Sequence, residues 1–123
     1  MTSKQTAAVD PAGEEPLHAS FSRLNAMMHI GELATAVWRA EQAVTQLHGI
    51  YVRKIRDYEG RYGAVDGRID PRNHEHIAII AYTMDEKLAL DSARRKVHAA
   101  RRRLRTACGK AACIEASTST GAV

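Results

Sequence analysis

The sequence predicts an all-α fold: a long antiparallel helical hairpin that pairs into a four-helix bundle or a coiled-coil-like oligomer. Three observations predict this class. Residues 17–70 contain no proline and are rich in alanine, leucine, methionine, glutamate and arginine, which favour helices. Apolar residues recur every seven positions, and no segment of any length shows the alternation of a β-strand. One segment rich in glycine and aspartate separates two long helix-forming stretches, as expected for a helical hairpin.

The composition fits one small folded domain. The chain has 123 residues, of which 45% are hydrophobic and 26% charged, and this balance excludes collagen-like and wholly disordered proteins. No window approaches the ~20 apolar residues of a membrane-spanning helix, and the N-terminus lacks the apolar core of a secretion signal. We therefore expect a cytoplasmic protein. Its two cysteines, Cys108 and Cys113, are expected to be free thiols, as is usual in a reducing compartment.

The chain divides into a central domain and two end segments. Residues 1–16 are polar, contain two of the three prolines and show no periodicity, so we expect a disordered arm. A single helical-hairpin domain is expected over residues 17–112. Residues 113–123 are expected to form a disordered tail.

Within the domain, two helices flank one turn. The first helix is expected over about residues 17–62 and the turn over about residues 63–70, beside a cluster of break signals at Gly60, Gly63, Asp66 and Gly67. The second helix is expected over about residues 71–110. Asp70 can cap the free N–H groups at its start, and Pro71 suits the first helical position because its missing N–H would be unpaired there.

The first helix carries a seam of the coiled-coil type. Its members recur at seven-residue intervals with a second set between them: Ile30, Leu33, Val37, Ala40, Val44, Leu47, Tyr51, Ile55, Tyr58 and Tyr62. This is the strongest periodic signal in the chain, and it predicts a packing core. A matching stripe on the second helix consists of Leu90, Ala93, Val97, Ala100 and Leu104.

Both helices also carry apolar residues away from these stripes. A two-helix hairpin buries only one face of each helix, so the surplus faces need another surface. We expect a homo-oligomer, a dimer first, with a different protein partner or the folded-back N-terminal arm as alternatives. The residues expected at this interface are Phe21, Leu24, Met27, Met28, Trp38, Ile77, Ile80, Met84 and Leu88.

The charges agree with antiparallel pairing. The C-terminal half of the first helix is basic, with Arg53, Lys54, Arg56 and Arg61, whereas the N-terminal half of the second is acidic, with Glu75, Asp85, Glu86 and Asp91. Antiparallel pairing brings these halves together. Exposed pairs contribute about 0–1 kcal/mol each, so they select the orientation more than they stabilise it.

One dense cationic segment stands out in a chain whose formal net charge is only +4. Between Ser92 and Cys113 the sequence holds eight lysines and arginines and no acid. On a helix, most of these residues fall in one sector of about 120°. Arginine matches phosphate or carboxylate oxygens with two parallel hydrogen bonds. We therefore predict a polyanion-binding face made of Lys87, Arg94, Arg95, His98, Arg101, Arg102 and Arg105.

The sequence gives no sign of catalysis or of a cofactor. It contains no glycine-rich phosphate loop and no nucleophile motif, and His74 and His76 diverge by ~200° on a helix, so they cannot share a metal ion there. We expect no catalytic residues, no metal and no cofactor. The expected function is non-catalytic, oligomeric binding of a polyanion, nucleic acid first. The alternative is a small protein-interaction module or inhibitor, of a viral or accessory kind, that docks through its apolar Met/Trp face or its cationic face.

Overall fold

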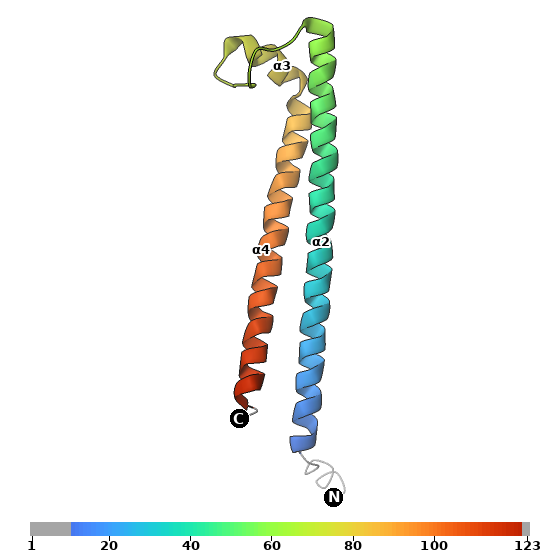
Figure 1. Ribbon diagram of the computed structural model, residues 1–123, viewed down its shortest axis with the longest axis vertical. Helices are drawn as coiled ribbons and strands as arrows, with labels where there is room; N and C mark the ends of the chain where they lie inside the picture. Colours follow the sequence, from blue (N-terminus) through green and yellow to red (C-terminus); the bar gives the residue numbers. More distant parts are fainter. Residues whose placement is uncertain (1–10, 122–123) are drawn as a thin grey trace, which may run out of the picture. The chain divides into compact units, whose positions relative to one another are not determined.

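The fold is an all-α helical hairpin, as the sequence predicts (Figure 1). The computed structural model describes the main chain of residues 11–121 and the side chains of residues 17–117. Its elements are the long helix α2 (Pro11–Tyr62), a 3₁₀ turn η1 (His74–His76), the short helix α3 (Ile77–Tyr82) and the long helix α4 (Met84–Gly121). Residues 1–10 of the predicted arm, and the last two residues of the predicted tail, lie outside the described residues.

Two parts of the chain are compact in themselves. One is the unit Thr35–Arg101, which contains the turn of the hairpin. The other combines the described residues up to Ala34 with those from Arg102 onward. We describe these below as the turn unit and the terminal unit.

The core of the turn unit is a narrow stripe on α3 and α4. Leu90, Ala93, Val97 and Ala100 are buried, which confirms the stripe predicted for the second helix, and Ile79 of α3 extends it. The seam of α2 opposite is half-buried from Val37 to Tyr58. Three of the five buried side chains are alanine or valine, so these helices can approach closely.

Contacts between α2 and the returning chain confirm the antiparallel direction. Lys54 Nζ lies 3.7 Å from a carboxylate oxygen of Glu86, which joins the basic and acidic halves as predicted. Farther from the turn, Arg101 donates a hydrogen bond to Glu41 at 3.1 Å. The later residue of α2, Lys54, thus pairs with the earlier residue of α4, and the earlier residue, Glu41, pairs with the later one. This order is that of two antiparallel helices.

The terminal unit is packed more thinly. Ala107 is its buried apolar residue among those described, and Leu104 and Ile114 are half-buried. A shallow hollow of about 370 Å³ is lined by Ala19, Ser22, Cys113, Ile114 and Ser117. Small side chains therefore line the space between the helices in this unit.

The first helix ends at Tyr62, as the sequence predicts, and the glycine that follows terminates it. Gly63 has a φ of +102°, a conformation that favours glycine, and its N–H donates to the Glu59 carbonyl at 2.9 Å. This bond caps the last turn of α2 after Tyr62. Both outer helix ends lie beyond the predicted ones. α2 begins at Pro11, a position where proline costs nothing, and α4 continues to Gly121.

The prediction of one continuous second helix from residue 71 is wrong. Asp70 instead accepts a hydrogen bond from the Arg72 N–H in a local turn, and Asn73 caps η1 by accepting from the Glu75 N–H. A second break lies at Thr83, whose hydroxyl donates to the Ile79 carbonyl at 2.8 Å. Such side-chain bonds bend helices. In Figure 1 the chain accordingly turns between α3 and α4.

Substitution of Leu90 tests the core. Leu90→Ala removes a side chain that is 1% exposed, so we expect a loss of roughly 2–5 kcal/mol of unfolding free energy. The matched control is Leu88→Ala, which changes a side chain that is 59% exposed and should shift the value by less than about 0.5 kcal/mol. Urea unfolding followed by circular dichroism measures both. Equal losses in the two variants would contradict the buried stripe.

Two glycines of the same helix end should respond oppositely to alanine. Gly63→Ala forces a Cβ into the positive-φ conformation and should destabilise the protein by about 1–2 kcal/mol. Gly60 lies inside the helix, and a Cβ there would meet no atom within 4 Å. Gly60→Ala should therefore stabilise by roughly 0.5–1 kcal/mol. Thermal unfolding of both variants checks the sign of each change.

Candidate anion-binding surface on α4

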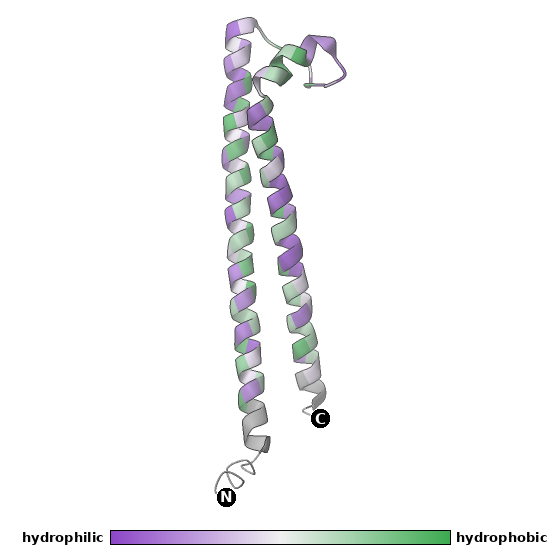
Figure 2. Cartoon of the chain, turned by 180° about the vertical axis from the view of Figure 1, so that it is seen from behind, coloured by the Kyte–Doolittle hydropathy of each residue, from purple (hydrophilic) through white to green (hydrophobic). Residues whose placement is uncertain are grey.

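Every cation of the segment between Ser92 and Cys113 lies on the exposed side of α4, because the buried stripe occupies the other side. Because Leu90, Val97 and Ala100 face α2, the residues between them face outward. The eight cations between Ser92 and Cys113 are all exposed: Arg94, Arg95, Lys96, Arg101, Arg102, Arg103, Arg105 and Lys110. α4 runs without a break through all of them, and Figure 2 shows strongly hydrophilic residues alternating with apolar ones along it.

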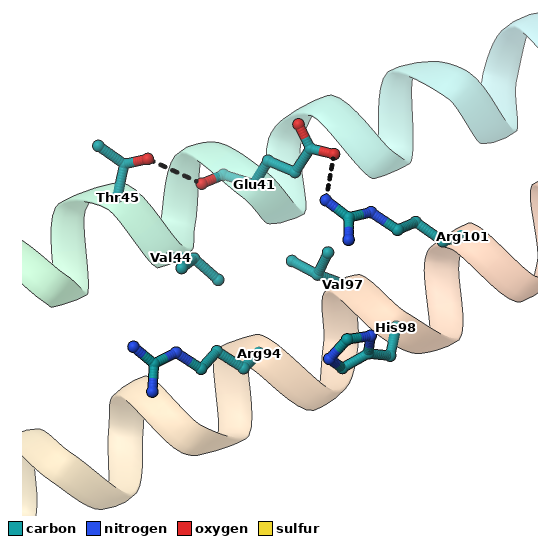
Figure 3. A pocket seen from close by; sticks show the side chains of 7 residues that line it. All are labelled: Glu41, Val44, Thr45, Arg94, Val97, His98 and Arg101. Carbon is teal, nitrogen blue, oxygen red and sulfur yellow. Dashed lines mark hydrogen bonds and ion pairs between the residues drawn. The ribbon is translucent and has the colours of Figure 1, made fainter.

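In the turn unit, part of this surface borders an open groove (Figure 3). The groove has a volume of about 450 Å³ and is lined from α4 by Arg94, Val97, His98 and Arg101, and from α2 by Glu41, Val44 and Thr45. Val44 and Val97 form the apolar floor between the helices. The polar side chains stand at the rim, so the groove combines an apolar floor with a mainly cationic edge.

Three of the predicted anion-binding residues already contact carboxylates of this chain. Arg101 pairs with Glu41, while Arg94 and Lys87 both approach Asp91, at 3.6 and 3.3 Å. These side chains are about half-exposed, so each pair contributes less than about 1 kcal/mol and is weakened by salt. A stronger anion can compete for these three cations, but it must displace a carboxylate first.

The other four predicted residues are exposed and form no ion pair with a described residue of this chain. Arg95 and His98 belong to the turn unit, and Arg102 and Arg105 to the terminal unit. They follow one another along the same helix. Arg95, Arg102 and Arg105 therefore need no exchange of partners before an external anion binds.

The residues predicted for an oligomer or partner interface are mostly exposed. Phe21, Leu24, Met27, Met28, Trp38, Ile77, Met84 and Leu88 have exposed fractions between 49% and 68%. Ile80 is half-buried instead, because it lies one residue after the buried Ile79. The described chain therefore covers little of these apolar faces.

Sequence reasoning missed a polar and aromatic cluster beside the turn. The Tyr82 hydroxyl donates a short hydrogen bond to the Asp57 carboxylate. Its ring packs against Tyr58 and Tyr62, with centroids 5.5 and 6.4 Å away, and Lys54 Nζ lies 4.5 Å from its centroid. The hydrogen bond from Tyr82 lowers the pKa of Asp57, against a smaller opposing effect of desolvation, and raises the pKa of Tyr82 itself.

This cluster gives a pH-dependent prediction. A lowered pKa means that Asp57 contributes stability above its unfolded pKa and loses it as the pH falls through the folded one. Tyr82→Phe should therefore raise the pKa of Asp57 toward its usual value, whereas Tyr58→Phe, which keeps the hydrogen bond, should leave it unchanged. An NMR titration of the Asp57 carboxyl carbon measures both. An unchanged pKa in the Tyr82 variant would contradict the assigned cause.

His76 has a structural role rather than a place in a metal cluster. It is 3% exposed, and its Nδ1 accepts a hydrogen bond from the Asp70 N–H at 2.9 Å, which ties the loop to η1. Within the described residues no group of three or more histidine, cysteine or acidic side chains is placed to hold a metal ion. Cys108 and Cys113 are free and exposed.

Comparisons with known protein families, known proteins and solved structures found no match to this chain. None of the described helices combines the length and the apolar character needed to cross a bilayer.

Proposed function

We propose that this protein is a non-catalytic binding protein that contacts a polyanion, nucleic-acid phosphates first, through the cationic face of α4. The observation that carries the proposal is that the segment between Ser92 and Cys113 holds eight exposed cations and no acid. Only Arg94 and Arg101 of the eight form an ion pair with a described residue. The helix dipole favours cations only in the last turn of a helix, and α4 continues to Gly121, so the dipole does not account for these eight residues.

The chemistry of the surface favours phosphate. Six of the eight cations are arginines, whose planar fork binds phosphate oxygens through two hydrogen bonds. Cations on one face of a helix can contact the phosphates of a nucleic-acid backbone. The groove at Arg94, His98 and Arg101 adds an apolar floor beside this face.

Recognition of this kind depends on charge and has little sequence preference. Contacts to phosphates position a protein on nucleic acid, whereas base edges supply sequence information. The chain has no base-reading motif that would add such contacts. Binding should therefore be similar for different sequences and should weaken steeply as salt rises.

A second candidate function rests on a separate observation. Met27 and Met28 of the terminal unit are 68% and 58% exposed, Trp38 of the turn unit is 60% exposed, and large exposed apolar side chains are typical of protein interaction sites. A protein-interaction module that docks through this surface would bind with little dependence on salt. Salt dependence therefore separates the two functions.

The experiment is fluorescence anisotropy with a labelled random-sequence duplex at several salt concentrations. We expect tight binding at low salt and a steep fall of log K with log salt. The triple variant Arg95→Gln, Arg102→Gln, Arg105→Gln should bind more weakly, with the slope reduced by about 0.9 for each lost phosphate contact. These arginines form no ion pair with a described residue, so the helical content should be unchanged.

The matched control removes the same charge from the other helix. Arg39, Arg53 and Arg56 are also exposed arginines, and changing all three to glutamine lowers the net charge equally. This control should retain most of the binding and the slope. Equal weakening in both triple variants, or no binding of the wild type at low salt, would contradict the proposal.

A further inference from the structure

The N-terminal part of α2 carries a second coiled-coil repeat that faces away from the hairpin seam. Leu17, Phe21, Leu24 and Met28 follow one another at intervals of four, three and four residues, which is the spacing of a coiled-coil seam. On the helix this row lies roughly opposite the half-buried Ile30. We call these four residues the outer seam.

All four side chains of the outer seam are exposed. Their exposed fractions are 61% for Leu17, 57% for Phe21, 53% for Leu24 and 58% for Met28. Four large apolar side chains in a 3–4 repeat fit knobs-into-holes packing against a second helix. The helix that covers them should therefore present complementary residues at matching spacing.

We propose that the outer seam packs against the outer seam of a second copy of this chain, in antiparallel orientation about a two-fold axis near Ala26. In this register Leu24 lies beside the second copy's Met28, and Phe21 beside the second copy's Gly31. Both contacts occur twice, once on each side of the axis, as two-fold symmetry requires. The inference does not depend on the proposed phosphate binding.

Side-chain size supports the second copy as the partner. Gly31 continues the 3–4 spacing of the outer seam after Met28, and a Cβ built on it would meet no atom within 4 Å. The antiparallel register places the largest member of the seam, Phe21, over this smallest position. A parallel register would instead stack Phe21 on Phe21 and glycine on glycine, which crowds one layer and leaves a void in another.

The polar residues beside the seam fit the same arrangement. On one flank of the seam, the antiparallel register places His18 beside the second copy's Glu32. It places Asn25 beside the Asn25 of the second copy. On the other flank Met27 meets its own mate and extends the apolar contact, consistent with its 68% exposure in the single chain. No like charges face each other in this register. The segment is thus complementary to its own reversed copy in size, and its flanks bring no like charges together.

A pair of methionine substitutions tests the interface. We expect the full-length wild type to sediment with twice the chain mass of 13.5 kDa. Met28→Asp places a charge in the outer seam and should reduce the mass to that of one chain. The matched control Met84→Asp changes another exposed methionine, 49% exposed against 58% for Met28, at the start of α4, and should keep the dimer. A monomeric wild type, or dissociation by both substitutions, would overturn the proposal.

Cysteine cross-linking tests the orientation without destabilising the helix. In a background with Cys108→Ser and Cys113→Ser, Asn25→Cys lies next to its symmetry mate in the antiparallel register, so oxidation should yield a covalent dimer. The control Arg23→Cys lies outside the flanks and should remain monomeric on a denaturing gel. A dimer from the control alone, or from neither variant, would overturn the antiparallel register.

Discussion

The fold depends on one narrow contact, the packing of the stripe on α3 and α4 against the seam of α2. The buried members of that stripe in the turn unit are Ile79, Leu90, Ala93, Val97 and Ala100, and three of them are small. Small side chains bring the helices close together but remove little apolar area from water. The seam of α2 stays half-buried, so the hairpin alone has a thin core. Large apolar residues elsewhere on the same helices stay exposed.

This contact also determines what α4 presents to the solvent. Once Leu90, Val97 and Ala100 face α2, helical periodicity places the arginines outward, some at the edge of the groove and others away from it. The edge position explains why Arg101 reaches Glu41 on the facing helix. Arg95 and Arg102 have no carboxylate within reach among the described residues. The same helix therefore stabilises the hairpin with one side and offers unpaired positive charge with the other.

Much of the fold follows from the sequence, because seven-residue periodicity and the order of charges are local patterns that one chain reveals. The seam, the stripe around Leu90, the end of α2 near Tyr62 and the meeting of the basic and acidic halves are of this kind; the contact of Lys54 with Glu86 is one instance of the last. The break at Thr83 was missed because it depends on whether a hydroxyl bonds back to the Ile79 carbonyl. The Asp57–Tyr82 hydrogen bond and the pairing of Glu41 with Arg101 were missed because they depend on the register between the helices. Periodicity alone does not determine that register to better than one helical turn. For the candidate site, the sequence predicts which cations lie there. It does not predict which of them form ion pairs with carboxylates of the same chain.

The central claim is that the outward arginines of α4 form the surface that binds polyanions. It is tested most directly by an NMR titration of ¹⁵N-labelled protein with a short oligonucleotide, following the arginine Nε–Hε signals. We predict that the signals of Arg95, Arg102 and Arg105 shift first and furthest, and that Arg101 follows once its bond to Glu41 is displaced. Shifts confined to arginines of α2, such as Arg39 and Arg53, or no shifts at low salt, would contradict the account.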